Sequence, residues 1–437
     1  MSRVVVTGIG SVSPCGNSLY ESWNSARSGL SGITTIKRFD SSHLKWQMGG
    51  ELKGFEAGKY LSQKEIIRLD PFVHYAVAAA IMAMEDAGLI RYSSVIGHQS
   101  MVKKNSVNLS TYECQLQTAD YLTSGGVIIG SSRGGISTIE KELQKLYLAR
   151  LTHHASRLSA YLMPSTTISM ASSYVAQKLG IKGYCLGISN ACASGSNAIG
   201  EGYRLIKSGF RFPVLCGGSE APLCMVCLEG YGVAGALSKV KDSSASRPFD
   251  RKRDGFILSE GACIFVLEEY KLAVNRGARI YGEIIGYGNT TDSFHQTIPS
   301  SEGEARAIKN ALDEAGLEPG DIDFINAHGT STPLGDKTET EAIKLCLGKQ
   351  AYNIPISSVK SITGHMLAAS GALEAAFTFL SMNEGYIIPT INLKERDPEC
   401  DLDYVTEIRK ADTEFAISNS FGFGGLNAVL VLKRLIV

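Results

Sequence analysis

The sequence carries no excess of either charge, because 43 lysines and arginines balance 43 aspartates and glutamates. Proteins that bind nucleic acids or membrane surfaces carry a basic excess, so we expect neither as a partner. No stretch approaches the ~20 apolar residues of a membrane-spanning helix. Near the N-terminus only Val4–Val6 form an apolar run, which is too short for a signal peptide. The absence of a charge excess, a membrane span and a signal peptide predicts a soluble protein of the cytoplasm.

The sequence also has only two tryptophans and no pattern of paired cysteines. Its ten cysteines are scattered, and most lie in apolar runs such as Gly261–Val266, where a reduced cysteine is a small core residue. Cys224 and Cys227 have the spacing of a metal or redox pair, but no second pair follows at zinc-site distance. We interpret them as packing residues, expect no metal, and infer a reducing compartment.

What the sequence does contain is 46 glycines and 44% hydrophobic residues over 437 positions. Short β-branched runs alternate with helical patterns, which predicts an α/β fold whose sheets are covered by helices. One helix is expected from Glu302 to Ala315, with Gly316 as its stop. Another is expected to begin at Asp336, with Glu339 completing a capping box.

An internal repeat makes the fold prediction more specific. Ala191–Gly195 and the helical pattern to Gly209 resemble Leu367–Gly371 and the pattern to Gly385, at an offset of 176 residues. A chance match is the alternative, because few residues are identical. The repeat predicts a duplicated α/β unit.

The boundary between the two halves is expected in the polar, turn-rich segment 240–258. We therefore divide the chain into an N-terminal half, 1–255, and a C-terminal half, 256–437. A polar stretch without periodicity runs from about residue 91 to about residue 124. We expect it to be a surface excursion from the first half.

Cys192 is the cysteine that lies outside an apolar run, and it opens a predicted helix. Unpaired amides and the positive end of the helix dipole favour the thiolate form. The same amides could stabilise an oxyanion after attack on a carbonyl. From these residues alone, the alternative is a small cysteine that fills a helix–strand junction.

Three further polar residues follow strand-like segments. His328 comes just after the strand predicted at 322–325, where its imidazole can move protons or donate hydrogen bonds. Lys360 and His365 share a second motif, and Glu374 lies where it can pair with Lys360. The alternatives are a histidine satisfied by the backbone and a solvated lysine.

Five motifs together carry a family resemblance. They are Asn190–Gly195, Arg247–Gly255, Asn326–Pro333, Lys360–His365 and Asn419–Gly425. With them, the chain resembles the elongating β-ketoacyl-acyl carrier protein synthases from Val4 to Asn427. The resemblance implies a thiolase-like fold, in which duplicated βαβαβαββ halves form a five-layered αβαβα arrangement. It also implies a homodimer, with a heterodimer of related subunits as the alternative.

The resemblance implies the following chemistry. Cys192 receives an acyl group from acyl carrier protein, malonyl-carrier loses its carboxylate, and the carbanion attacks the acyl-cysteine to give a 3-oxoacyl product. The backbone amides of Cys192 and Phe423 would form the oxyanion hole, and His328 and His365 would bind the thioester oxygen. Lys360, paired with Glu374, would orient His365. No cofactor is expected beyond the phosphopantetheine that the carrier brings.

The resemblance also assigns residues to substrate binding. Thr330 and Thr332 would bind the pantetheine arm, and Phe423 would gate the acyl pocket. Phe421 and Asn427 would also contact substrate.

Some residues depart from the family pattern. Arg133 stands where a small or apolar residue lines the acyl pocket, which predicts a short, polar or unsaturated acyl substrate, unless Arg133 turns away into a salt bridge. Lys64 and Arg68 keep part of the basic patch expected to dock the carrier, while Ile67 and Gly235 do not.

Two functions other than a self-paired enzyme stay open. One is a polyketide ketosynthase that acts with an inactive partner subunit. The other, from a different class, is an acyl-binding subunit without turnover.

Overall fold

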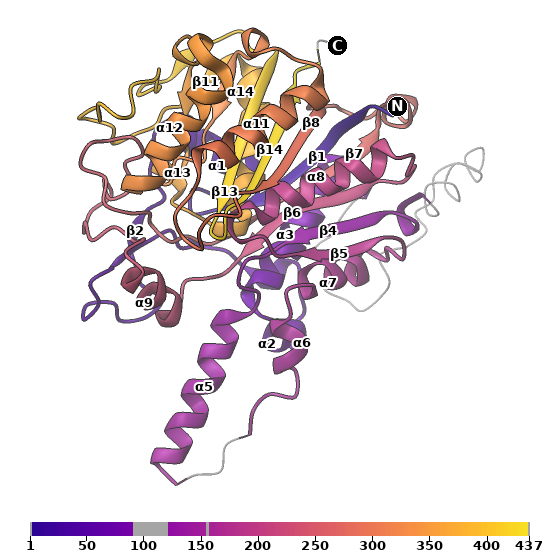
Figure 1. Ribbon diagram of the computed structural model, residues 1–437. Helices are drawn as coiled ribbons and strands as arrows, with labels where there is room; N and C mark the ends of the chain where they lie inside the picture. The colour runs from indigo at the N-terminus through magenta and orange to yellow at the C-terminus, as the bar shows by residue number, and fades with distance from the viewer. Residues whose placement is uncertain (1, 91–120, 154–156, 436–437) are drawn as a thin grey trace, which may run out of the picture.

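The computed structural model describes residues 2–90, 121–153 and 157–435. Its main sheet has ten strands in the order β10-β9-β13-β14-β8-β1-β7-β6-β4-β5 (Figure 1). These strands are β1 (Val4–Val12), β4 (Gly126–Gly130), β5 (Cys185–Ile188), β6 (Val214–Glu220), β7 (Gly261–Glu269), β8 (Gly282–Thr291), β9 (Phe324–Asn326), β10 (Ile356–Ser357), β13 (Phe415–Gly422) and β14 (Leu426–Lys433). Two short pairs stand apart from it: β2 (Thr34–Thr35) with β3 (Met48–Gly49), and β11 (Tyr386–Ile387) with β12 (Arg409–Lys410).

Helices connect and cover these strands. They are α1 (Leu19–Arg27), α2 (Gln63–Arg68), α3 (Pro71–Asp86), α5 (Ile136–Leu151), α6 (Leu162–Thr166), α7 (Met170–Leu179), α8 (Ser194–Lys207), α9 (Met225–Val233), α10 (Tyr270–Asn275), α11 (Ser301–Ala315), α12 (Pro333–Leu347), α13 (Lys360–Thr363) and α14 (Ser370–Glu384). Two short 3₁₀ turns, η3 (Ala191–Ala193) and η6 (Leu367–Ala369), directly precede α8 and α14.

The strand order repeats within the sheet. Numbered by chain order within each half, the strands follow 3-2-4-5-1 both in β5-β4-β6-β7-β1 and in β10-β9-β13-β14-β8. In both halves the first three strands of that order are parallel and the last two pairings are antiparallel. The halves join where β1 pairs with β8, Val4 lying opposite Ile284. The predicted duplication is therefore present in the topology.

The change from one repeat to the next falls later than the sequence analysis places it. The strand β7 pairs with β1 and β6 of the first repeat, so the repeats meet between Glu269 and Gly282 rather than at residue 255. The polar segment 240–258 is a loop inside the first repeat. Of the proposed excursion, 91–120 lies outside the described residues.

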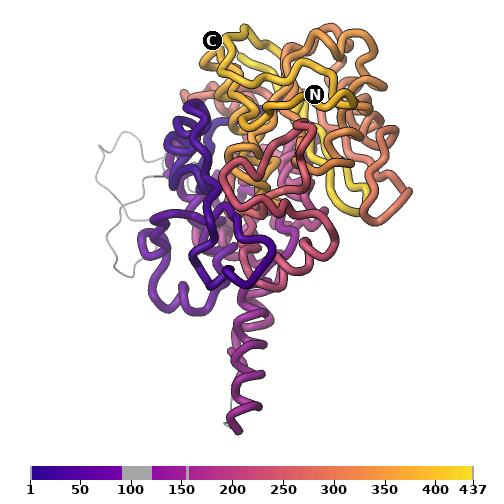
Figure 2. Tube along the Cα trace, turned by 90° about the vertical axis from the view of Figure 1, so that its left-hand side faces the viewer, coloured from indigo at the N-terminus to yellow at the C-terminus, as the bar shows by residue number. Residues whose placement is uncertain are grey.

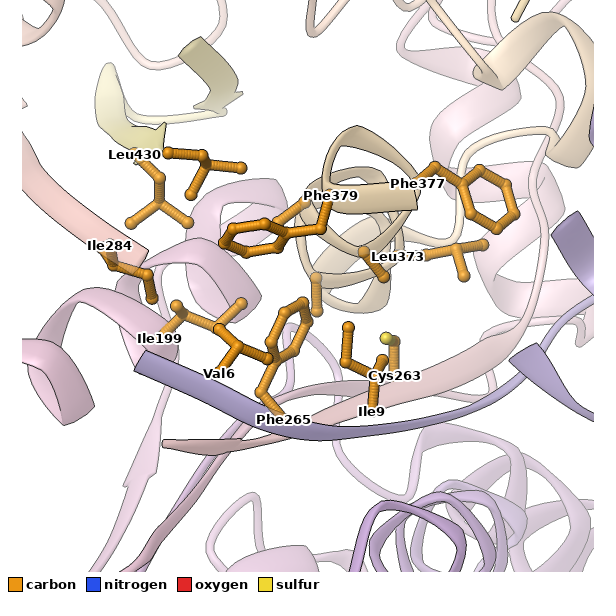
Figure 3. Packing of buried hydrophobic residues seen from close by; sticks show 14 of the residues in the cluster. Val6, Ile9, Ile199, Cys263, Phe265, Ile284, Leu373, Phe377, Phe379 and Leu430 are labelled. Atoms are coloured by element: carbon orange, nitrogen blue, oxygen red, sulfur yellow. The ribbon is translucent and has the colours of Figure 1, made fainter. Parts of the chain in front are cut away.

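Alternation of side chains along the strands builds five layers. In β7, Cys263, Phe265 and Leu267 point into a central core shared with α8 and α14. The intervening Ile264 and Val266 point to an outer core under α3 and α7. In β14 the second outer core lies under α11 and α12. Because both faces of both halves are covered, the strands are apolar on both sides. Figure 3 shows the central core, where Phe379 of α14 packs over Phe265 with ring centroids 6.4 Å apart.

The helices α8 and α14 begin in the same way. Each follows a 3₁₀ turn whose first residue has a left-handed backbone, Ala191 with φ 48° and Leu367 with φ 46°. A Cβ on Gly195 would lie 2.2 Å from the Ala368 carbonyl oxygen, and one on Gly371 would lie 2.2 Å from Ser196 Oγ. Only glycine permits this approach, which explains the repeated Ala-Ser-Gly pattern.

The two predicted helix starts have different outcomes. The helix α11 has Ser300 as its N-cap and ends at Gly316 in the left-handed region, as expected. The capping box at Asp336 is wrong, because α12 begins at Pro333 with Thr332 as its cap. Asp336 is buried one turn later and accepts the backbone N–H groups of Phe249 and Ser331. Proline is favoured at the first position of a helix, so Pro333 rather than Asp336 marks the start of α12.

The helix α5 projects from the body of the molecule in both views (Figures 1 and 2). Leu143, Tyr147, Leu148 and Leu151 on it are more than half exposed. Across the described residues, none of the helices has the length and apolar character that a membrane crossing requires.

We expect Gly195→Ala to destabilise the protein, because its Cβ overlaps the backbone oxygen of Ala368. Overpacking of this kind costs about 1–3 kcal/mol, occasionally more. Urea unfolding followed by circular dichroism measures the loss. Gly230→Ala on α9 is the matched control, since nothing lies within 4 Å of a Cβ there. An alanine at 195 as stable as one at 230 would contradict the packing argument.

Candidate active site

The chain brings Cys192, His328 and His365 together from both repeats. Cys192 lies in η3, His328 follows β9 by two residues, and His365 lies between α13 and η6. The cysteine sulfur and one nitrogen of each histidine all lie within 4.8 Å of one another. The two imidazole rings stand nearly perpendicular, with centroids 5.3 Å apart. The predicted three-residue set is therefore assembled.

His328 is held by its backbone. Its N–H donates to Glu339 Oε1 at 2.8 Å, and the Gly329 N–H donates to Glu339 Oε2 at 2.7 Å. Its carbonyl accepts from Lys360 Nζ at 2.6 Å, and the same ammonium pairs with Glu374 Oε1 at 2.5 Å. The predicted Lys360–Glu374 pair is present and buried, where an uncompensated charge would be costly.

His365 is positioned by Ser370 rather than by Lys360, which corrects the expected role of the lysine. Its Nδ1 lies 3.0 Å from Ser370 Oγ, and that oxygen also accepts the Met366 N–H at 2.8 Å. The Ser370 hydroxyl is thus free to donate its proton to Nδ1. In that tautomer Nε2 carries the hydrogen and can donate to a substrate oxygen.

Electrostatics make the resting set neutral. Burial raises the pKa of the Cys192 thiol to about 11, although the charges of Lys360 and Arg133 oppose that shift. The expected thiolate is therefore not the resting form at neutral pH. Burial, reinforced by the Lys360 charge, holds the pKa of His328 and of His365 well below the ordinary value. A neutral imidazole can accept the thiol proton when Cys192 attacks.

The loop after β13 brings a second backbone donor to the cysteine. The Phe423 N–H lies close enough to the Cys192 sulfur to lower the pKa of its thiol. A Cβ on Gly422 would lie 3.2 Å from the Cys192 nitrogen, so the two backbones approach closely. The Gly424 N–H donates to the Gln296 carbonyl at 2.8 Å and fixes the loop. Two N–H groups beside one sulfur are the arrangement that stabilises an oxyanion.

Comparison with known proteins decides the family. Residues 1–273 match the β-ketoacyl synthase N-terminal domain, and residues 281–394 match its C-terminal domain. The chain belongs to the β-ketoacyl synthase family. These enzymes form carbon–carbon bonds, so the resemblance in the five motifs is confirmed.

Relatives match over almost the whole chain. The 3-oxoacyl-[acyl-carrier-protein] synthase 2 of Synechocystis is 44% identical over 437 residues, covering 99% of this chain and 98% of its own. The Staphylococcus aureus (strain COL) protein of the same name is 41% identical over 436 residues, with coverage of 99% and 98%.

Two solved structures of ketosynthases share the fold. The ishigamide ketosynthase/chain length factor has a TM-score of 0.86 at 34% identity, with 100% of both chains covered. A type II polyketide ketosynthase, solved in complex with its acyl-carrier protein and bound to the hexaketide, has a TM-score of 0.84 at 31% identity, also with 100% coverage. The thiolase-like fold class is confirmed.

Other predicted residues of this β-ketoacyl synthase lie around the set. Thr330 and Thr332 are partly exposed, and their hydroxyls lie 2.9 Å apart. Phe421 is buried against His328, with ring centroids 6.0 Å apart. Phe423 is 37% exposed and faces Tyr231. Asn427 is buried and donates to Asp292 at 2.6 Å, so it holds the segment behind the loop rather than a substrate.

Three predicted residues lie on the surface. Arg133 is exposed, and its Nε donates to the Tyr231 hydroxyl at 2.8 Å. Lys64 and Arg68 are exposed on α2, one helical turn apart, away from the three-residue set. The Arg68 guanidinium carbon lies 4.5 Å from the centre of the Tyr161 ring.

Sequence reasoning missed Ser370, Tyr231 and the role of Glu339. Ser370 stands in the second Ala-Ser-Gly, so the repeat carried a usable signal. Glu339 comes only 11 residues after His328, but its contacts with the His328 and Gly329 backbone were not visible in the sequence. Tyr231 lies outside all five motifs, and only the fold places it beside the site.

The set also has a composition that a metal could use. Cysteine and histidine are ligands that Zn²⁺ accepts. A sulfur bound to zinc could not carry an acyl group at the same time, so metal binding and acyl transfer would exclude each other at Cys192.

The pKa of Cys192 predicts how its reactivity depends on pH. Because only the thiolate is alkylated, the rate with iodoacetamide should keep rising through pH 10. Peptide mass spectrometry after brief pulses separates Cys192 from the exposed Cys185. A plateau below about pH 8.5, the value for an unperturbed cysteine, would contradict the raised pKa of this thiol.

Proposed function

We propose that this β-ketoacyl synthase condenses an acyl group on Cys192 with a malonyl group on acyl carrier protein. The observation that carries the proposal is the cluster of one sulfur and two imidazole nitrogens within 4.8 Å, spanned by both repeats. Relatives named 3-oxoacyl-[acyl-carrier-protein] synthase 2 at 44% and 41% identity support it. The product is a 3-oxoacyl thioester two carbons longer than the starting acyl group, for fatty acid or polyketide synthesis.

In the first half-reaction the Cys192 sulfur attacks the thioester carbonyl of acyl-carrier. The thiol proton passes to a neutral imidazole nitrogen and then to the departing carrier thiol, so the exchange is balanced. The N–H groups of Cys192 and Phe423 stabilise the oxyanion. No prosthetic group is required beyond the phosphopantetheine on the carrier.

In the second half-reaction the malonyl carboxylate leaves as CO₂, and its bonding electrons pass into the thioester as an enolate. That enolate oxygen gains negative charge and needs hydrogen-bond donors, which the Nε2–H group of His365 and the neighbouring His328 imidazole supply. The enolate carbon then attacks the acyl-cysteine carbonyl, and the Cys192 sulfur departs as a thiolate that takes up a proton from solvent. The Lys360 ammonium, which donates to the His328 carbonyl, lies behind this ring and favours the developing anion.

Substitutions at Cys192 separate condensation from decarboxylation. We expect both Cys192→Ala and Cys192→Gln to lose condensation entirely, because the acyl acceptor is gone. Cys192→Gln should keep releasing CO₂ from malonyl-carrier, since its amide mimics the acylated residue and both histidines remain. Carrier-product mass spectrometry and CO₂ release measure the two steps. Condensation that survives in either variant would refute the proposal, and an acyl-binding subunit would show no turnover even in the wild type.

We further propose that α2 docks the acyl carrier protein. A ketosynthase of the same fold was solved in complex with its carrier. Lys64 and Arg68 are exposed on one helix, whereas the intervening Glu65 is occupied by Tyr174 and Lys178. Two basic side chains are therefore left to face an acidic carrier.

Charge reversal at Lys64 and Arg68 tests this surface. The double variant Lys64→Glu, Arg68→Glu should raise KM for acyl-carrier at least about tenfold, and less so at high salt. The rate of Cys192 alkylation should stay unchanged, because neither residue touches the site. An unchanged KM would remove α2 from the docking surface.

A second copy of the chain is the partner that we propose for α5. That helix projects from the body and exposes four large apolar side chains along its length, and such a surface is typical of an interface. A homodimer would cover it, and a related subunit in a heterodimer is the alternative. We place the enzyme in the cytoplasm, where a reducing medium keeps Cys192 a free thiol.

A further inference from the structure

Arg133 has a fixed backbone beside the active site. It lies in the loop after β4, where the buried carboxylate of Glu220 accepts the N–H groups of Ser132 at 2.7 Å and Arg133 at 3.0 Å. The same carboxylate accepts the Ser131 hydroxyl at 3.0 Å. The root of the Arg133 side chain is therefore held in place.

The guanidinium of Arg133 is bound by a phenol and not by a carboxylate. Its Nε donates to the Tyr231 hydroxyl at 2.8 Å, and its central carbon lies 5.2 Å from the Tyr231 ring centre. In the described part of the chain Arg133 makes no ion pair, so the salt-bridge alternative from the sequence is not what the structure shows. Its terminal nitrogens keep donors for another acceptor.

Tyr231 connects this guanidinium to the reacting sulfur. Its ring lies 6.3 Å from that of Phe423 and 5.5 Å from that of Phe256, which itself lies 5.1 Å from the His365 ring. Cys192 packs against the apolar cluster that contains Tyr231 and Phe256. Tyr231, with Arg133 bound to its hydroxyl, therefore lies beside the sulfur that would carry the acyl group.

We propose that the Arg133–Tyr231 pair selects acyl groups whose chain bears an oxygen acceptor, a hydroxyl, carbonyl or carboxylate, over saturated chains of equal length. This inference rests on the proposed condensing function. A saturated chain would strip water from a guanidinium that has no counter-ion, whereas an oxygen on the chain would accept its hydrogen bonds. A site built to hydrogen-bond its substrate rejects an analogue that lacks the acceptor.

The test is the rate at which carrier thioesters acylate Cys192, followed by intact-protein mass spectrometry. Hexanoyl, 3-hydroxyhexanoyl and 5-oxohexanoyl chains have equal length and differ in oxygen. We expect the wild type to prefer at least one oxygen-bearing chain by about tenfold or more. Arg133→Met should abolish the preference and accelerate hexanoyl transfer, and Arg133→Lys should keep part of it. Tyr231→Phe, which removes the partner of Nε, should weaken it independently.

Arg211→Met is the matched control, because Arg211 is exposed before β6, at the end opposite Glu220; it should keep the preference. Equal rates for all three chains in the wild type, or a preference that survives Arg133→Met, would overturn the inference. So would a rise in KM for malonyl-carrier with an unchanged acyl preference, which would assign Arg133 to the malonyl carboxylate. Failure of all three chains to acylate wild-type Cys192 would instead count against the proposed function.

Discussion

The close approach of two helix starts is the contact on which the active site depends. Gly195 and Gly371 let α8 and α14 meet between the two halves of the sheet, with no room for a side chain at either position. The turn before α8 carries Cys192, and the first residue of α14 is Ser370, which holds His365. The nucleophile and a histidine are therefore positioned by one packing interface that neither repeat could form alone.

Burial then sets the protonation states of Cys192, His328 and His365. The thiol and both imidazoles are neutral at rest, because desolvation disfavours their charged forms. The Lys360–Glu374 pair and Glu339 lie behind the set and are fixed by hydrogen bonds. Such a site presents oriented hydrogen-bond donors to the oxyanion and enolate, which carry charge only during the reaction. Because these donors are already in place, they need not reorganise when that charge forms.

The sequence predicted the residues with reactive or charged side chains in recognisable motifs. It did not predict the residues that reach the site only because the chain folds. Cys192, His328, His365 and the Lys360–Glu374 pair could be named because motif and spacing identify them. The repeat boundary was misplaced because polarity marks loops, whether or not they separate repeats. The thiolate expectation failed because a helix terminus is visible in sequence and the extent of burial is not. Tyr231 required the fold, since nothing local connects it to Arg133.

The central claim is that one site couples loss of CO₂ to carbon–carbon bond formation at Cys192. The most direct measurement supplies the wild-type enzyme with acetyl-carrier and with malonyl-carrier labelled in its free carboxylate, and counts both products. The account predicts one labelled CO₂ for each 3-oxoacyl-carrier formed, with the product two carbons longer than the acetyl primer. Release of labelled CO₂ without a longer product, or of free acid from the acylated cysteine, would contradict it.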